Sequence, residues 1–214
     1  MSKTLTGTSL TPEAPAATMI AVSSIVIIAL YAAAQMMADI GSLKIGFIAG
    51  LSIDGGTFIY PITFTLRDMI HKKLGKKAAR TIIIICALIN LVMALFFALL
   101  TKLPSDPSWG LQNEFASILG PVWRIVLASI AAEVISELLD TEMYHLWVTK
   151  ITTKFQWARV LFSNVVSVPV DSLIFGLIAF WGLMSADTVW SIILANIIVK
   201  GIVTIISIPL IYLV

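Results

Sequence analysis

Six apolar stretches divide the sequence, and each is close to the length that crosses a bilayer as a helix. They lie at about 18–38, 45–66, 79–101, 117–146, 158–183 and 187–213. About 20 consecutive apolar residues span the hydrocarbon core as a helix. The pattern therefore predicts an all-α integral membrane protein with six transmembrane helices. We expect a single six-helix domain at 18–214, preceded by a flexible polar tail at 1–17.

The second stretch is the least regular of the six. It contains several glycines, the acidic residue Asp54 and the proline Pro61. Glycine and proline both interrupt helices, and irregular backbone at membrane depth persists where protein or a water-filled cavity covers it. The segment 45–66 therefore predicts either a broken, re-entrant entry before a helix or an ordinary helix that bends.

Composition narrows the class of protein. Of the 214 residues, 59% are hydrophobic and 12% are charged, whereas soluble domains carry about 25% charged residues. This excludes a soluble enzyme, a disordered chain and a nucleic-acid-binding module. The sequence has one cysteine, Cys86, and no HExxH, G-x-S-x-G or P-loop motif. We therefore expect no enzymatic activity, no cofactor and no metal site.

Basic residues outside the apolar stretches predict the orientation in the membrane. Most of them lie in the loops after the second and fourth stretches: Arg67, Lys72, Lys73, Lys76, Lys77, Arg80, Lys150, Lys154 and Arg159. The loops of the opposite side carry Lys44 and Lys102. Because cytoplasmic loops are enriched in lysine and arginine, we expect a multi-pass protein of the cell inner (plasma) membrane with both termini in the cytoplasm. Binding of anionic lipid or of a cytoplasmic partner is the alternative explanation for these loops.

Charged side chains inside the apolar stretches are the strongest functional signal. Glu133, Glu137, Asp140, Asp171 and Lys200 lie in or near the interiors of the predicted spans. Each charge costs about 2.5–3.5 kcal/mol at the bilayer centre, so these side chains must face one another or a watery cavity. At about 100° per residue, the three acids of the fourth stretch share one helix face.

Polar residues on other stretches lie at the same depth and extend the candidate site. The candidate substrate-binding residues are Asn90, Glu133, Glu137, Asp140, Asn164, Asp171, Phe175 and Asn196. Polar residues that converge near the midplane from several helices are typical of transporter sites, and structural hydrogen bonds between helices are the alternative. We expect Lys200 to be a charge partner of Asp171 or Glu133 rather than a ligand contact, because an unpaired ammonium at that depth is costly.

Several segments resemble one family of membrane proteins. The motif residues are Tyr60, Pro61 and Asp68 around the second stretch, Ser136, Glu137 and Asp140 in the fourth, and Arg159, Ser163, Ser167, Asp171, Ser172 and Phe175 in the fifth. Together they resemble the queuosine precursor transporter family, also called the vitamin uptake transporter family, over about 46–182. Lys72 stands where that family usually carries an acid.

The resemblance implies a fold similar to the six-helix substrate-binding subunits of energy-coupling-factor importers. It also implies import of a 7-deazaguanine precursor of queuosine, such as 7-cyano-7-deazaguanine. A carboxylate can accept from adjacent N–H groups of such a base, and Tyr60, Trp147 or Phe175 can cover its flat faces. The expected partners are a small purine-like substrate and the lipid bilayer, without nucleic acid. A homodimer and a separate ATPase module stay open.

Three other functions fit the same residues. The chain can be the substrate-binding subunit for another vitamin, dependent on a separate ATPase module. It can be an integral membrane enzyme that uses Glu137 and Asp140 as an acid–base pair. It can also be a structural membrane scaffold, which should tolerate neutral substitutions of the acidic residues.

Overall fold

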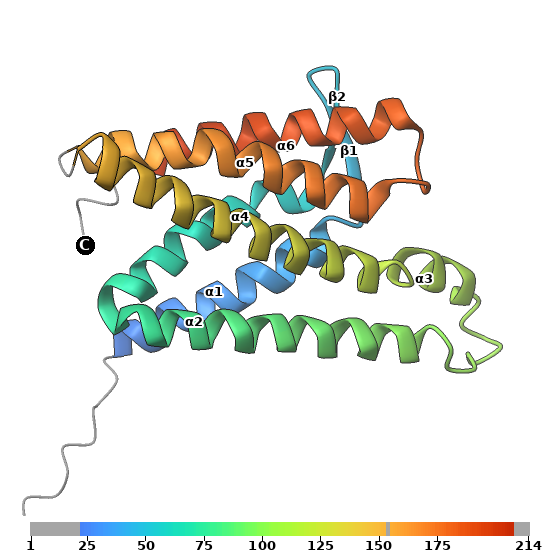
Figure 1. Ribbon diagram of the computed structural model, residues 1–214. Coiled ribbons are helices and arrows are strands. Elements are labelled where there is room, and N and C mark those ends of the chain that lie inside the picture. Colours follow the sequence, from blue (N-terminus) through green and yellow to red (C-terminus); the bar gives the residue numbers. More distant parts are fainter. Residues whose placement is uncertain (1–21, 153–154, 208–214) are drawn as a thin grey trace, which may run out of the picture.

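The computed structural model describes residues 22–152 and 155–207, so the predicted tail at 1–17 lies outside the described residues. In chain order the elements are α1 (Val22–Gly41), β1 (Ile45–Ile48), β2 (Leu51–Asp54), the 3-10 helix η1 (Gly55–Phe58), α2 (Tyr60–Leu100), α3 (Gln112–Leu119), α4 (Val122–Lys150), α5 (Gln156–Phe180) and α6 (Ala186–Ser207). The long helices form a bundle, and the β1–β2 hairpin projects from it (Figure 1).

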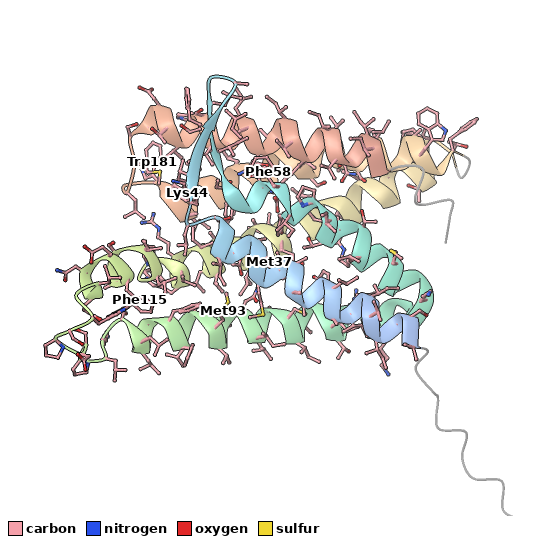
Figure 2. All side chains as sticks on the ribbon, turned by 180° about the vertical axis from the view of Figure 1, so that it is seen from behind. Met37, Lys44, Phe58, Met93, Phe115 and Trp181 are labelled. Atoms are coloured by element: carbon pink, nitrogen blue, oxygen red, sulfur yellow. The ribbon has the colours of Figure 1, made fainter. Side chains whose placement is uncertain are left out.

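Within the described residues, five helical segments are long and apolar enough to cross a membrane. They are Val22–Gly41, Lys77–Leu100, Gln112–Ser136, Leu161–Phe180 and Ala186–Ile206. Large apolar side chains on these segments stay exposed, such as Val92 at 66% and Val165 at 72%, and carbon-rich side chains cover the outside of the helices in Figure 2. Such a surface is unfavourable in water and suited to lipid. The mainly helical membrane class is therefore confirmed.

The segment predicted as the second transmembrane helix, 45–66, is not one continuous helix. Its first part is an antiparallel hairpin in which Ile45 pairs with Asp54. Ala49 and Gly50 turn the chain with positive φ angles of 52° and 83°, a conformation that suits short hairpin turns. The 3-10 helix η1 follows, and α2 then begins with Pro61 in its first turn. The broken entry was thus the correct alternative, and the all-α prediction missed the hairpin.

Helix α2 consists of two arms that meet at Gly75. This glycine has the non-helical angles φ 83° and ψ 168°, which residues with a β-carbon rarely adopt. The first arm, 60–74, is about 22 Å long at 1.5 Å per residue, which is shorter than the hydrocarbon core. The second arm carries the span Lys77–Leu100.

Successive helix ends alternate between the two ends of the bundle. The start of α1, the bend of α2, the end of α4 and the end of α6 lie at one end, on the left in Figure 1. The connections from α2 to α3 and from α5 to α6 lie at the other end. Lys77 beside the bend and Lys150 in the last turn of α4 therefore belong to the same end. This arrangement agrees with the predicted grouping of the basic loops on one side.

Apolar packing between α4, α5 and α6 fixes the helices that carry the charged residues. Their shared core contains Ile125, Ala128, Ala179, Phe180, Val189, Ile192 and Ile193. At Gly176 on α5, an added β-carbon would collide with the side chain of Ile193 on α6. The glycine thus permits a close approach of the two helices, which brings Asp171 on α5 within reach of Lys200 on α6.

Candidate functional site

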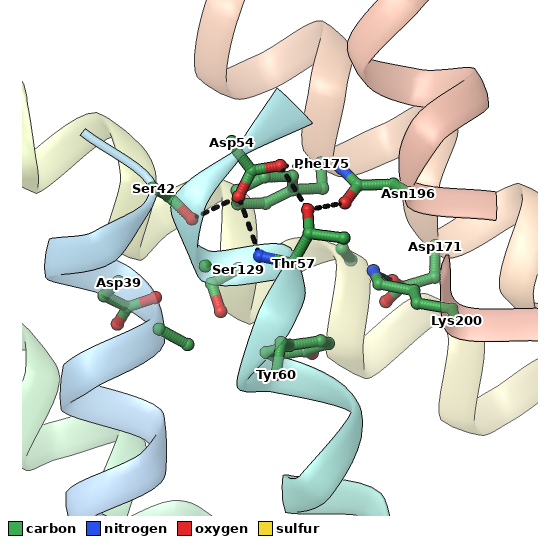
Figure 3. A pocket seen from close by; sticks show the side chains of 13 residues that line it. Asp39, Ser42, Asp54, Thr57, Tyr60, Ser129, Asp171, Phe175, Asn196 and Lys200 are labelled. Carbon is green, nitrogen blue, oxygen red and sulfur yellow. Dashed lines mark hydrogen bonds and ion pairs between the residues drawn. The ribbon is translucent and has the colours of Figure 1, made fainter. Parts of the chain in front are cut away.

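A small cavity lies inside the bundle where α1 ends and α2 begins (Figure 3). It is lined by Ala38, Asp39, Ser42, Asp54, Gly56, Thr57, Tyr60, Ser129, Ala132, Asp171, Phe175, Asn196 and Lys200. The volume open to the centre of a water molecule is about 20 Å³, which is room for one or two ordered waters. The interrupted backbone between α1 and α2 therefore lines an internal polar cavity, as irregular backbone at membrane depth is expected to do.

Asp54 ties the irregular segment to its neighbours. Its Oδ1 accepts from Ser42 Oγ at 2.8 Å and from the backbone N–H of Thr57 at 3.2 Å. Its Oδ2 accepts from Thr57 Oγ1 at 2.7 Å and from Asn196 Nδ2 at 3.0 Å. Thr57 Oγ1 also contacts Asn196 Oδ1, so the single hydroxyl proton serves one of these two acceptors at a time. Asp54 thus caps η1 and joins it to α6.

Two glycines allow η1 to sit directly against the end of α1. A β-carbon at Gly55 would lie 2.6 Å from the carbonyl oxygen of Gly41. A β-carbon at Gly56 would collide with Ser42 Oγ and with the carbonyl oxygen of Ala38. The paired glycines after Asp54 are therefore the local reason that the start of α2 reaches the cavity.

Asp171 and Lys200 form a buried ion pair at the cavity. Lys200 Nζ lies 2.5 Å from Asp171 Oδ2, and neither side chain is more than 4% exposed. Ser136 Oγ donates to Asp171 Oδ1 at 3.2 Å, and Lys200 Nζ lies 4.7 Å from the centre of the Tyr60 ring, within cation–π range. One of the two pairings predicted for Lys200 is therefore present, and it lowers the cost of burying either charge alone.

Asp39 lies across the cavity from this ion pair, as Figure 3 shows. Asn90 Nδ2 donates to Asp39 Oδ2 at 2.7 Å, and Ser129 on α4 lines the cavity beside the same carboxyl group. Asn90 Oδ1 is buried and has no hydrogen-bond partner among the described residues. The Asp39 carboxyl group therefore links α1 to the second arm of α2 and lies beside α4 at the cavity wall.

The structure brings four residues predicted from sequence to the cavity: Asp171, Phe175, Asn196 and the charge partner Lys200. Asn90 does not line the cavity itself and reaches it through its hydrogen bond to Asp39. The depth of Asn90, Asp171, Asn196 and Lys200 in the bundle was predictable because each is a polar side chain within an apolar stretch.

Glu133 and Asn164 do not line this cavity, and their role in substrate binding stays a prediction. Tyr31 donates to Glu133 Oε1 at 3.3 Å and accepts from Gln35 Nε2 at 3.0 Å. Glu133 thus belongs to a hydrogen-bonded link between α1 and α4. Asn164 Oδ1 accepts from Ser167 Oγ at 3.5 Å within α5. Each of the two shares a helix face with a residue that lines the cavity, but neither lines the cavity itself.

Four further residues singled out from sequence have side chains outside the described part of the structure. They are Glu137 and Asp140 on α4, Asp68 on α2 and Arg159 on α5. Their roles in substrate binding or in the family motif stay predictions. The same holds for the acid–base pair considered for Glu137 and Asp140.

The other motif and aromatic residues divide between the cavity and the surrounding helices. Tyr60 lines the cavity, Pro61 lies in the first turn of α2, and Ser167 is buried on α5. Trp147 packs on Phe162, with 5.3 Å between ring centres, and is not part of the lining. Of the aromatic covers considered for a flat ligand, Tyr60 and Phe175 are therefore placed to act.

Sequence reasoning missed the cavity residues contributed by the end of α1 and by the irregular segment after it. Asp39 and Asp54 are the charged ones among them, and Thr57 is their polar neighbour. A signal for Asp39 was present, because Tyr31, Gln35 and Asp39 are spaced four apart and share one face of a helix. No comparable spacing marks Asp54, whose position depends on the hairpin.

A bundle with a lipid-compatible surface and a buried polar cavity defines this chain as a multi-pass membrane protein with an internal polar site. The family described as "Putative vitamin uptake transporter" matches residues 54–214, and the chain belongs to this family. The resemblance seen in the sequence is therefore confirmed.

A protein of Bacillus subtilis (strain 168) named "Probable queuosine precursor transporter" is similar to this chain. The two are 28% identical over 184 residues, which cover 84% of this chain and 79% of that protein. No solved structure matches the chain.

Proposed function

We propose that this protein imports a 7-deazaguanine precursor of queuosine, such as 7-cyano-7-deazaguanine, across the cell membrane. Membership of a transporter family supports the transport function. The name of the similar Bacillus subtilis protein supports the substrate class. The observation that carries the proposal is the buried cavity, which collects polar groups from separate helices inside an apolar bundle.

The chemistry of the cavity wall fits a flat heterocycle with polar edges. A deazaguanine base offers ring and amine N–H donors, a carbonyl acceptor and two broad apolar faces. Carboxylates on two sides of the cavity accept N–H donors, and the hydroxyl of Ser129 can donate to a carbonyl. The rings of Tyr60 and Phe175 can pack on the faces. The Asp171 carboxylate, paired with Lys200, can accept from the pyrrole N–H of the base.

The described conformation is closed, and a substrate must open it. A volume of about 20 Å³ for water centres is far below the needs of a two-ring base. Entry therefore requires side chains such as Tyr60 and Lys200 to move apart. Transporters alternate between states of this kind, and substrate shifts their populations by binding one state better. The conformation is then a closed state of the carrier.

The positions of the basic residues indicate the orientation of the protein in the membrane. Lys77 lies at the end of the bundle that contains the bend of α2, and Lys150, in the last turn of α4, lies at the same end of the bundle. Because cytoplasmic loops are enriched in such residues, this end faces the cytoplasm. Both termini of the chain then lie in the cytoplasm, and substrate enters from the end with the α5–α6 connection.

Reconstitution separates this proposal from the main alternative, in which the chain binds another vitamin and depends on an ATPase module. The purified protein is placed in liposomes, and entry of labelled 7-cyano-7-deazaguanine is measured with no other protein present. We expect uptake by wild type and by Asp187→Asn, a control at an exposed acid in the first turn of α6. We expect loss of uptake in Asp171→Asn.

The outcomes of this experiment point to different conclusions. Uptake by the chain alone supports a self-sufficient carrier. Binding without uptake, with uptake restored by added ATPase subunits, supports the alternative. Absence of both binding and uptake, with correctly inserted protein, contradicts the substrate assignment.

A further inference from the structure

We propose that Asp39 recognises the amine-bearing edge of the substrate and that Asn90 positions the Asp39 carboxylate for this task. The inference rests on the proposed function and deepens it, because it assigns one carboxylate of the cavity to one edge of the base. Asp39 then determines whether a deazaguanine is preferred over the same base without its exocyclic amine.

The first step is to compare the three carboxyl groups that line the cavity, which belong to Asp39, Asp54 and Asp171. An ionised carboxylate offers about four acceptor sites. Asp54 already receives up to four hydrogen bonds, two from Thr57 and one each from Ser42 and Asn196, with the Thr57 hydroxyl proton shared between Asp54 and Asn196. Most of its acceptor capacity is therefore used, so Asp54 serves the fold of the irregular segment.

Asp171 uses part of its hydrogen-bond acceptor capacity, and its negative charge is paired with the ammonium group of Lys200. It is paired with Lys200 at 2.5 Å and accepts from Ser136 at 3.2 Å. It keeps some acceptor capacity, which suits a single N–H donor. A second N–H donor beside the first would compete with the ammonium of Lys200 for the same oxygen atoms.

Asp39 differs from both in its partners. The neutral amide of Asn90 donates to it and the neutral hydroxyl of Ser129 lies beside it, and no lysine or arginine pairs with it among the described residues. The side chain is 2% exposed. A carboxylate at membrane depth with neutral partners and unused acceptor sites is costly, and a ligand with N–H donors would supply the missing partners.

The amine-bearing edge of a deazaguanine fits this carboxylate. The ring N1–H and the exocyclic amine lie side by side, and a carboxylate can accept from both at once, as in other bidentate pairs. The ring carbonyl follows next to N1, where the hydroxyl of Ser129 can donate to it. Asn90 holds one oxygen of Asp39 through its 2.7 Å hydrogen bond, which fixes the plane of the carboxylate before the ligand arrives.

Removing the exocyclic amine from the ligand should therefore lower its binding affinity, because the carboxylate of the site pairs with that amine. A site whose groups pair with a hydrogen-bond donor of the ligand binds the analogue without that donor much more weakly, because buried polar groups of the site are left unpaired. One charge-assisted hydrogen bond corresponds to about a ten- to hundredfold change in affinity. This is the preference that we expect from wild type for the amine-bearing base.

The test measures binding of two ligands to purified protein in lipid nanodiscs. The ligands are 7-cyano-7-deazaguanine and the same base without its exocyclic amine. The proteins are wild type, Asp39→Asn and the control Asp187→Asn. We expect wild type and the control to prefer the amine-bearing base about ten- to hundredfold. In Asp39→Asn we expect the preference to fall below about threefold, because affinity for the amine-bearing base drops selectively.

Asn90→Ala tests the positioning role with the same readout. The preference ratio should fall between those of wild type and Asp39→Asn. A merely structural role would reduce the amount of folded protein, but it would leave this ratio unchanged, because both ligands report on the same folded fraction. An unchanged ratio in Asn90→Ala therefore contradicts the positioning role.

Two results would overturn the assignment of Asp39. The first is a full preference for the amine-bearing base in folded Asp39→Asn. The second is the absence of such a preference in wild type that binds both bases, and this result needs no variant to fold. If wild type binds neither base, the proposed function fails, which is distinguishable from failure of the Asp39 assignment.

Discussion

The ion pair of Lys200 and Asp171 makes a quantitative prediction about stability. Lys200→Met keeps an unbranched side chain and removes the ammonium group. Asp171 is then left in a buried position, and among the described residues it keeps the 3.2 Å hydrogen bond from Ser136. We expect a marked loss of thermal stability, because an unpaired charge cannot be solvated well at this depth.

The size of this loss follows from the burial of the pair. Removal of one partner from a buried ion pair costs about 3–5 kcal/mol. The cavity beside the pair has room for one or two waters, which favours the lower value of about 3 kcal/mol. For a chain of this size, each kcal/mol lowers the melting temperature by about 2–4 °C. Lys200→Met should therefore melt roughly 6–12 °C below wild type.

Double variants in detergent melts identify the partner of Lys200. Adding Asp171→Asn to Lys200→Met removes the stranded charge and should recover at least about half of the loss. Adding Glu133→Gln instead should give additive losses, because Glu133 accepts from Tyr31 and the ion pair of Lys200 in the described part of the chain is with Asp171. Strict additivity for Lys200 and Asp171 would refute the reasoning, since it would mean that the two charges are not coupled.

Further predictions test the topology, the packing and the acids. In a cysteine-free background, a cysteine at Ser105 should react with an impermeant label added outside cells and one at Lys77 should not; the reverse pattern would invert the proposed orientation. Gly56→Val should lower the melting temperature by several degrees and abolish uptake, because its side chain meets the end of α1; a wild-type melt would exclude that close packing. Asp171→Asn and Glu137→Gln should each lower substrate affinity about ten- to hundredfold while the protein still inserts. Wild-type affinity in both would show that these acids are structural.

The fold was predictable from sequence wherever one apolar run coincides with one helix. α1, the second arm of α2 and the helices α4 to α6 satisfy this condition, since burial in lipid requires long apolar segments with internally paired backbone. The segment 45–58 does not, because a hairpin and a 3-10 turn are stabilised by contacts with α1 and α6. Glycine and proline predicted an interruption there, but the form of the interruption depends on tertiary packing.

The site was predictable where a charge interrupts an apolar run, as for Asp171 and Lys200. Asp39 and Asp54 were not predicted as site residues because they lie at the end of a helix and of a strand, where acids are usually exposed. Their burial results from the way the chain folds back over the cavity. Glu133 shows that a charge inside an apolar run can accept a hydrogen bond from a neighbouring helix, here from Tyr31, outside the wall of this cavity.

The most direct test of the central claim is restoration of queuosine in the tRNA of cells that cannot make its deazaguanine precursor and must import it. Cells that express this chain are supplied with 7-cyano-7-deazaguanine, and the similar Bacillus subtilis protein serves as the positive control. We predict that wild type and Asp187→Asn restore queuosine and that Asp39→Asn does not at limiting precursor. If the wild-type protein is inserted in the membrane and tRNA still lacks queuosine while the positive control restores it, the proposed function is contradicted.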